Sequence, residues 1–395
     1  MATSSQKLPS HKTHWWYNPN IRAKLFELIV LSIIIVVFIY IAQNTLHNLE
    51  KRGISTGFGF LSNPAGFGIL QTLIPYDETD SFGRTFLVGL LNTLLVSGLG
   101  ICFATVLGFT IGIARLSSNW LVAKLALLYI ETFRNIPLLL QIFFWYFAVL
   151  RTLPSPRQSV AVADLAYLNV RGLYLPKPIP SDAFDGVLLV FFLTILAIFL
   201  FKKWARYHHA KTGQIIPIFW ISIISLFGFP ALTFFALGSP LTWDTPELQG
   251  FNFRGGLVII PELIALVTAL SIYTAAFIAE IIRAGIQSVS HGQTEAAYSL
   301  GLQRHQTLRL VVIPQALRVI IPPLTSQYLN LVKNSPLATA IGYPDLVAVF
   351  AGTTLNQTGQ AVEIIMMTMA VYLVISLAIS ALMNGYNHLI ALKER

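Results

Sequence analysis

Long runs of apolar residues, separated by short segments that carry most of the charges, constrain this chain more than any other feature. Runs of this kind are typical of helices that cross a bilayer. Hydrophobic residues make up 55% of the chain and charged residues only 11%, so its apolar surface cannot be left in water. We therefore predict an all-α polytopic membrane protein of about eight helices. The runs lie at about 25–42, 86–113, 121–150, 187–201, 215–237, 257–282, 314–332 and 364–389.

Basic residues between the runs predict which ends face the cytoplasm. The 26 Lys and Arg residues against 17 Asp and Glu give a net charge of +9. They gather in short segments such as residues 1–24 and the stretch KKWARYHHAKTGQ at 202–214, as the positive-inside rule requires of cytoplasmic segments. With eight spans, both termini are then cytoplasmic. No basic stripe interleaves with stacking aromatics, so we predict no nucleic-acid binding.

Metal and disulfide chemistry has little support in the sequence. Cys102 is the single cysteine and lies inside an apolar run, which excludes an intrachain disulfide, a multi-cysteine zinc site and a CxxC redox pair. His208 and His209 are adjacent rather than on one helical face, so we interpret them as solvated loop residues. We predict no metal site. The first apolar run follows a polar stretch and is interpreted as a retained anchor rather than a cleaved signal peptide.

The third run is interrupted by ETFRNIPLLLQ. Pro137 removes a backbone donor and disfavours helix at the residue before it, so the helix should break beside Arg134 and Asn135. Charges at this depth are costly in lipid and normally face a partner, a cavity or a path. The alternative is a structural salt bridge between Arg134 and a carboxylate such as Glu131.

The run at 314–332 is bent by two prolines and carries three amides. Gln327, Asn330 and Asn334 follow a spacing that puts them on one helical face. They form either the wall of a hydrophilic path or core amides that bond to neighbouring helices, and Lys333 should sit near the outer end. The candidate path residues are Arg134, Asn135, Pro137, Gln327, Asn330, Lys333 and Asn334.

Two further patterns suggest helix contacts. Gly108 and Gly112 form a GxxxG pair, which either lets another helix approach closely or reflects the general abundance of glycine in membrane helices. Thr268, Ser271 and Thr274 recur at helical spacing and give the run at 257–282 one polar stripe.

A polar, basic interlude at 295–314 separates two of the long runs. Ser290 followed by Gln293 has the form of a capping box, so a helix should start there. Glu295 lies near its first turn, and Ala296, Ala297 and Leu300 would form a small apolar ridge. Gly301 suits a left-handed position after the helix, and a second short helix from about Arg304 leads into Pro314.

These segments carry a specific resemblance. Glu295-Ala296-Ala297, with Gly301 six residues after the glutamate and a terminal Pro314, resembles the EAA loop in the membrane subunits of ATP-binding-cassette (ABC) importers. The stretch 134–141 resembles the RxxPLLxQ signature of polar amino-acid permeases, and the segment after Lys333 resembles their KxSSL element. Pro336 departs from it, which puts hydroxyl contacts at that position in doubt.

The resemblance covers about 84–150 and 257–390 and implies a type I ABC importer transmembrane fold. The domain prediction is an N-terminal part at 1–83, with the first span and an external loop, followed by a permease domain at 84–395. An insertion at 151–256 with two extra spans interrupts that domain. The chain would belong to the larger permease subunits of general L-amino-acid uptake systems.

Partners and roles also follow from the resemblance. The EAA loop would dock on a cytoplasmic ABC ATPase, through the coupling residues Glu295, Ala296, Ala297, Leu300, Gly301 and Pro314. The partners would be two copies of the ATPase, a second homologous permease in a heterodimer, a periplasmic amino-acid-binding protein and membrane lipid. We expect a multi-pass protein of the bacterial inner membrane with no cofactor on this chain.

The chain has no constellation for driving transport or catalysis by itself. GxxxxGK[ST], HExxH and GxSxG are absent from the sequence, so ATP hydrolysis would belong to a partner and the chain is not predicted to be an enzyme. The alternative is an ion-coupled secondary amino-acid transporter, which needs a titratable carboxylate near the midplane. Glu131 alone lies deep, and no internal repeat is evident. A purely structural scaffold would have no use for the intramembrane prolines and amides.

Overall fold

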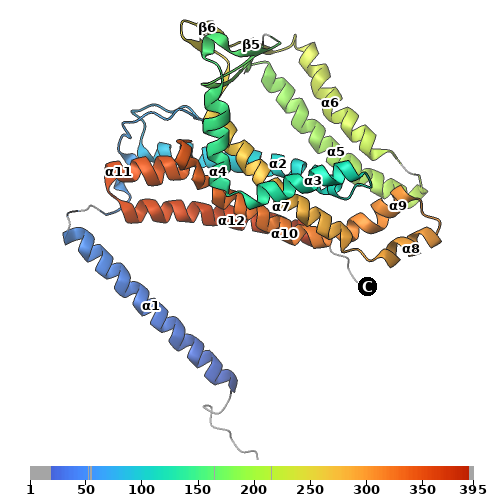
Figure 1. The fold of residues 1–395 in the computed structure, drawn as a ribbon, viewed down its shortest axis with the longest axis horizontal. Coiled ribbons are helices and arrows are strands. Elements are labelled where there is room, and N and C mark those ends of the chain that lie inside the picture. The colour runs from blue at the N-terminus through green and yellow to red at the C-terminus, as the bar shows by residue number, and fades with distance from the viewer. Residues whose placement is uncertain (1–18, 52, 54–55, 164, 215, 391–395) are drawn as a thin grey trace, which may run out of the picture. The chain divides into compact units, whose positions relative to one another are not determined.

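The computed structural model describes residues 19–51, 53, 56–163, 165–214 and 216–390, and it is mostly helical (Figure 1). Within this part of the chain, seven helices are long and apolar enough to cross a membrane, or up to eight if one bent pair is a single span. The predicted class of polytopic helical membrane protein is thus confirmed. The orientation of the termini stays a prediction, and residues 1–18 lie outside the described residues.

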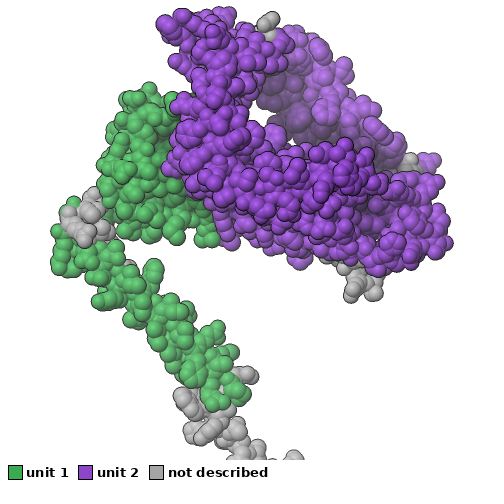
Figure 2. Space-filling view, in the orientation of Figure 1, with its two compact units in different colours: residues 1–90, 346–373 green, residues 91–345, 374–395 purple. Residues whose placement is uncertain are grey.

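The chain divides by packing into two compact units, residues 1–90 with 346–373 and residues 91–345 with 374–395 (Figure 2). This division describes packing, so the predicted boundary at residue 84 stays a prediction. The first unit holds part of α2 (Phe82–Arg115) and part of α12 (Ala361–Ile390). Its other elements are α1 (Pro19–Lys51), η2 (Gly59–Ser62), η8 (Val347–Thr354) and α11 (Leu355–Thr358).

Aromatic side chains form the core of the first unit. The ring of Phe350 lies 6.2 Å from that of Phe60 and 5.0 Å from that of Phe86, measured between centroids. A carboxylate oxygen of Glu363, in the first turn of α12, accepts a hydrogen bond of 2.6 Å from the backbone N–H of Gly57. These contacts attach the loop after α1 to the helices of this unit.

The second unit is organised around α7 (Pro261–Gln287), the most enclosed of the long helices. Helices α3 and α10 and the turn η3 pack against it. Between α3 and α7 the unit contains a helical hairpin and short strands, and beyond α7 it contains the loop that leads to α10. Its helical elements, besides parts of α2 and α12, are α3 (Trp120–Asn135), α4 (Leu138–Phe143), η3 (Phe144–Val149), η4 (Leu150–Thr152), η5 (Pro156–Gln158), α5 (Phe184–Thr212), α6 (Ile218–Ala236), α7, α8 (His291–Ser299), α9 (Arg304–Thr307), η6 (Leu308–Val312), α10 (Ile313–Asn334) and η7 (Ser335–Ile341).

Small residues explain why α7 can be surrounded so closely. A Cβ placed on Gly108 would lie 2.6 Å from Cβ of Ile278, and one on Gly112 would lie 2.8 Å from Cβ of Ile282. Backbone approach of this kind needs glycine on one of the two helices. The GxxxG pair of α2 therefore serves close packing against α7, which decides between the two interpretations of these glycines.

Short strands occupy the insertion on both sides of the α5–α6 hairpin. They form an antiparallel sheet in the order β1-β2-β3-β8 and two antiparallel pairs, β4 with β5 and β6 with β7. The ring of Phe253 stacks on Tyr167 at 4.6 Å. Burial raises the pKa of Tyr174, whose hydroxyl bonds to Asn252 at 3.0 Å. The strands are β1 (Val160–Val162), β2 (Ala166–Asn169), β3 (Gly172–Leu175), β4 (Lys177–Pro180), β5 (Leu241–Asp244), β6 (Glu247–Gln249), β7 (Asn252–Arg254) and β8 (Leu257–Ile259).

Two details of the insertion differ from the prediction. The proline-rich residues 151–182, at the start of the insertion, favour an extracytoplasmic loop in the sequence, whereas they contain four of these strands, so the fold is helical with a small β component. The basic stretch at 202–214 was also expected to be a loop, but α5 continues to Thr212. It ends where Gly213 adopts φ +69° and donates its N–H to His209 O at 2.9 Å. His208 and His209 are therefore helical residues.

Candidate functional site

The turn after α8 is closed by two backbone hydrogen bonds around Gly301. Leu302 N donates to Ala297 O at 3.1 Å and Gly301 N donates to Tyr298 O at 2.9 Å, which is a Schellman motif. Gly301 has φ +80°, and a Cβ built on it would have no neighbour within 4 Å. Glycine is thus needed here for its backbone conformation, as the sequence predicted, and not for space.

The start of α8 differs from the predicted capping box. Ser290 does occupy the N-cap, but its side chain makes no capping bond. The amide of Gln293 is engaged elsewhere, because its Oε1 accepts a hydrogen bond of 3.2 Å from Gln315 in α10. A capping box forms instead one helix later, between Gln303 and Gln306 at the start of α9.

The exposed face of α8 is not the expected alanine ridge. Ala297 is only 3% exposed, in a helix that packs against α9 and η6. Its predicted place on an outward surface is therefore wrong, since a buried methyl cannot contact a partner. Leu300 is 82% exposed and Tyr298 48%, and Ala296 is also exposed. Ala296 and Leu300, four residues apart, lie on one side of the helix and form the outward apolar surface, which we call the α8 surface, whereas Tyr298 lines the hollow behind α8.

Glu295 is an exposed residue of α8 rather than part of its first turn. Its carboxylate lies 3.2 Å from Nδ1 of His291, one turn earlier. Its backbone carbonyl accepts a bond from the hydroxyl of Ser299 at 2.9 Å. The side chain of Glu295 is 71% exposed, so it remains available to a partner.

A widened turn connects α9 to α10. In η6, a π-helical turn, Ile313 N donates to Leu308 O five residues earlier. Pro314 follows directly and has no N–H to give to Leu310, the acceptor that a regular α-helix would use. The missing N–H of Pro314 therefore accounts for the extra residue in this π-helical turn.

A hollow of about 480 Å³ lies behind α8. Its walls come from the end of α7, from α8 and from α9 with η6, and they include His291, Tyr298 and Arg304. Thr307 lines it as well and is 1% exposed. Helix α8 thus packs against α9 and η6 beside unfilled volume.

The predicted break at Pro137 is present. Helix α3 ends at Asn135, and the axis turns by 105° between it and the segment that begins at Leu138. The side chain of Gln141 donates to the carbonyls of Phe133 and Ile136, both at 3.0 Å. These bonds satisfy carbonyls that the broken helix leaves open, as required within a membrane. Gln141 was not among the predicted site residues; a glutamine four positions after a proline in an apolar run was the available signal.

Arg134 and Glu131 do not form the salt bridge considered above, and each contacts another residue instead. The guanidinium of Arg134 lies over the ring of Phe277 in α7, 5.2 Å from its centroid, which is a cation–π contact. Asn135 Nδ2 donates to the backbone oxygen of Glu131 at 2.7 Å and lies 3.4 Å from its carboxylate. Glu131, Arg134, Asn135 and Pro137 are all exposed.

The amides of α10 lie along one side of the helix, with unequal exposure. Asn330 and Lys333 are exposed, whereas Gln327 and Asn334 are partly buried. Ser326 is exposed one turn before Asn330 and extends the same polar stripe. It was missed because a single serine three residues after a pair of prolines has no distinctive pattern.

The two candidate path segments meet through common neighbours. Helices α3 and α10 both pack against α7, and α4 packs against η7, the turn that follows Asn334. Ser271 and Thr268 of α7 line a cavity of about 280 Å³ together with Phe103. Helix α7 is thus the common neighbour of both candidate path segments, and its own polar residues Thr268 and Ser271 line a cavity.

Comparison with known proteins supplies the family. A family model described as the inner membrane component of binding-protein-dependent transport systems matches residues 209–395. The putative amino-acid ABC transporter permease YhdX of Escherichia coli is 60% identical over 379 residues, 96% of each chain. The general L-amino acid transport system permease AapQ of Rhizobium johnstonii is 49% identical over 392 residues, 98% of each chain. The permease BztB of a glutamate/glutamine/aspartate/asparagine transport system in Rhodobacter capsulatus is 43% identical over 414 residues, 96% of each chain.

Proposed function

This chain belongs to the family of amino-acid ABC transporter permeases, and from that premise we propose how its parts divide the work of transport. It is a multi-pass inner-membrane permease subunit. In our proposal, the α8 surface receives the force from an ATPase, and the polar residues of α3 and α10 line the route of the amino acid.

The α8 surface is the proposed contact with the ATPase. The observation that carries this proposal is a rigid turn that presents an exposed leucine: the two hydrogen bonds around Gly301 support Leu300, which is 82% exposed. An exposed leucine held in place by a closed turn is a side chain that a groove on a partner could receive. Permeases of this family work with an ATPase and a binding protein. The ATPase would be the partner that contacts the α8 surface.

Movement of α8 would then act on α7 and α10 together. The chain enters α8 from the end of α7 and leaves through α9 and η6 into α10. The hollow of about 480 Å³ behind α8 leaves room for a shift, and the bond from Gln315 to Gln293 ties α8 to α10. A displacement of the segment from α8 to η6 would therefore tilt α7 and α10, the helices that flank the proposed path, as small shifts at one site do in other switching transitions.

The proposed substrates are polar L-amino acids. Such a molecule carries a carboxylate and an ammonium group, which Arg134 and Lys333 on one side and Glu131 with the amide of Asn330 on the other could bind in turn. These side chains are exposed in this chain. The names of the relatives point the same way, since AapQ is a general L-amino acid permease and BztB belongs to a system for acidic amino acids and their amides.

The proposed assembly contains more chains than this one. We infer two copies of the ATPase, a second homologous permease that forms a heterodimer with this chain, and a periplasmic binding protein that delivers the amino acid. Exposed charges within membrane-spanning segments, such as Arg134, support a second permease, because they should face protein or a cavity rather than lipid.

A pair of leucine variants tests the docking role. Leu300→Asp puts a charge on the α8 surface, whereas Leu70→Asp makes the same change at a leucine that is 85% exposed in the loop between α1 and α2. Each tagged variant is purified from its native membrane in mild detergent, and ATPase co-purification and amino-acid uptake are measured. We expect Leu300→Asp to lose both ATPase co-purification and amino-acid uptake, and Leu70→Asp to retain both.

Two outcomes would overturn the proposal. Equal ATPase co-purification by both variants would remove the α8 surface as the docking site. Uptake by the purified chain alone in liposomes, under an ion gradient and without ATP, would support the secondary-transporter alternative instead.

A further inference from the structure

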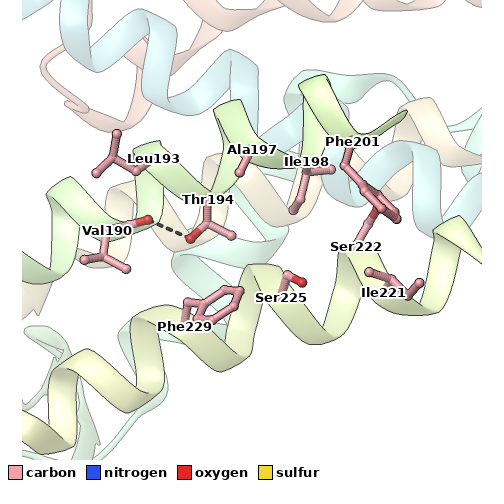
Figure 3. Close-up of a pocket in the computed structure, with 10 residues that line it drawn as sticks. All are labelled: Val190, Leu193, Thr194, Ala197, Ile198, Phe201, Ile221, Ser222, Ser225 and Phe229. Atoms are coloured by element: carbon pink, nitrogen blue, oxygen red, sulfur yellow. Dashed lines mark hydrogen bonds between the residues drawn. The ribbon is translucent and has the colours of Figure 1, made fainter. Parts of the chain in front are cut away.

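The hairpin of α5 and α6 contains a groove that the transport mechanism does not use. The two helices lie side by side and pack mainly on each other (Figure 1). Between them is a cavity of about 500 Å³. Figure 3 shows that Thr194 and Ala197 of α5 and Ser225 and Phe229 of α6 face this space. No residue of α6 is buried, so other molecules must cover the hairpin in a membrane.

The lining of the groove is suited to a hydrocarbon chain. It is formed mostly by aliphatic and aromatic side chains. The hydroxyl of Thr194 bonds to the backbone oxygen of Val190 at 2.7 Å, and among the described residues the buried hydroxyl of Ser222 in this lining has no hydrogen-bond partner. An apolar groove within the membrane favours an apolar occupant.

The length of the groove corresponds to one leaflet. On α5 its lining runs from Val190 to Phe201, which at the rise of an α-helix is about 16 Å. Half of a typical bilayer core is about 15 Å. The groove therefore spans the depth that the acyl chain of one lipid occupies.

A cluster of positive charges begins where the groove ends. Lys202 and Lys203 follow Phe201 directly, and Arg206 lies one turn further; all three are exposed. The three ion pairs found among the described residues involve other side chains. From Gly186 to Trp243 the sequence contains no Asp or Glu. The cluster thus lacks an acidic partner within the hairpin.

Aromatic rings accompany these charges in the manner of an interfacial belt. Trp204 is 52% exposed, and its ring stacks on Phe201 at 5.7 Å and on His208 at 5.1 Å. Indole side chains favour the headgroup region of a membrane. Trp204 therefore marks the level at which the headgroup of a lipid would lie beside Lys202 and Lys203.

We propose that the α5–α6 hairpin is a binding site for one anionic phospholipid. An acyl chain would occupy the groove between Val190–Phe201 and Ile221–Phe229, and the headgroup phosphate would bind the cluster at Lys202, Lys203 and Arg206. Basic residues next to a membrane span attract anionic headgroups. Charge complementarity and the direct continuity of groove and cluster favour this occupant over a helix of a second permease chain.

Photocrosslinking with a phosphatidylglycerol that carries a diazirine in its acyl chain tests the proposal. The transporter, purified with its partners, is placed in phosphatidylcholine vesicles that contain this probe, and the labelled peptides are identified by mass spectrometry. We expect labelling concentrated in 190–201 and 221–229. An equally labelled site with the matching phosphatidylcholine probe would overturn the proposal, since it would mean that charge does not matter.

Paired variants separate headgroup from groove. Lys202→Gln with Lys203→Gln should lower labelling about 25-fold, since each basic residue near an anionic surface is worth about fivefold. Arg22→Gln with Lys24→Gln, at the start of α1, is the matched control and should leave labelling of the groove unchanged.

Ser225→Phe fills the groove and should abolish labelling. The control Ile224→Phe should leave labelling unchanged, because this side chain is 67% exposed and lies outside the groove lining.

A photoreactive residue at position 225 distinguishes lipid from protein. Crosslinks from this position to phosphatidylglycerol support the proposal. Crosslinks to a second permease chain would overturn it, because they would show that a helix fills the groove. Labelling that survives removal of both lysines would equally overturn the assignment of the headgroup site.

Discussion

Gly108 of α2 and Ile278 of α7 approach so closely that the glycine has no room for a side chain. A Cβ on Gly108 would lie 2.6 Å from both Cβ and Cγ2 of Ile278 and 3.1 Å from the backbone oxygen of Ala275. Four residues later, Gly112 stands in the same relation to Ile282. The crossing of α2 and α7 thus depends on this pair, and α7 is the helix against which both path segments pack.

Gly108→Ala should therefore destabilise the subunit by about 1–3 kcal/mol, the usual cost of an overpacked core. The matched control is Gly98→Ala in the same helix, where a new Cβ would meet nothing within 4 Å and alanine favours the helix. Melting of each purified variant in detergent gives the comparison. Equal melting temperatures for the two variants would contradict the close crossing.

Gly301→Ala should reduce uptake while the subunit still inserts in the membrane. An L-residue in the left-handed region costs roughly 1–2 kcal/mol, which corresponds to a loss of about five- to thirtyfold in the correctly closed turn. Gly301→Asn should recover part of the activity, because asparagine tolerates this conformation, and Gly301→Val should uncouple transport. Gly213→Ala is the control, since Gly213 has a similar φ of +69° at the end of α5, outside the coupling loop. Wild-type uptake by Gly301→Ala and Gly301→Val would show that the turn is not part of coupling.

Features set by local backbone chemistry could be predicted from the sequence. The break at Pro137 and the left-handed turn at Gly301 depend on what proline and glycine permit, and the spans depend on apolar length. The strands β1 to β8 were missed because each has only three or four residues, and β4 even contains two prolines. The helical end of α5 was missed because its lysines indicate a cytoplasmic position without distinguishing loop from helix.

Features of the site that depend on distant partners could not be predicted. Gln293 has the right spacing to cap α8, but its side chain binds Gln315 in α10, 22 residues away. Ala297 and Leu300 both belong to the apolar ridge predicted from the sequence, yet in the folded chain Ala297 is 3% exposed and Leu300 82%. Sequence spacing gives the relative positions of side chains on a helix but does not say which of them a neighbour covers.

Asn330→Leu should lower amino-acid uptake about two- to tenfold without loss of the ATPase. The expected size corresponds to one hydrogen bond of about 0.5–1.5 kcal/mol to the substrate. Asn330→Ser keeps a polar group and should be less impaired. Uptake by the reconstituted transporter and ATPase co-purification are measured together, and unchanged uptake across several amino acids would remove Asn330 from the path.

Pro314→Ala should separate stability from coupling. With an N–H at this position, residue 314 could bond to Leu310 and the π-helical turn of η6 could revert to a regular α-helix. Loss of the extra residue in the turn would rotate α8 and α9 by about 100° relative to α10, so the α8 surface would no longer point toward its partner. Proline costs about 3 kcal/mol in a helix interior, so the variant should melt no lower than the natural protein while ATP-driven uptake falls. Retained uptake together with unchanged ATPase binding would show that the widened turn does not orient α8.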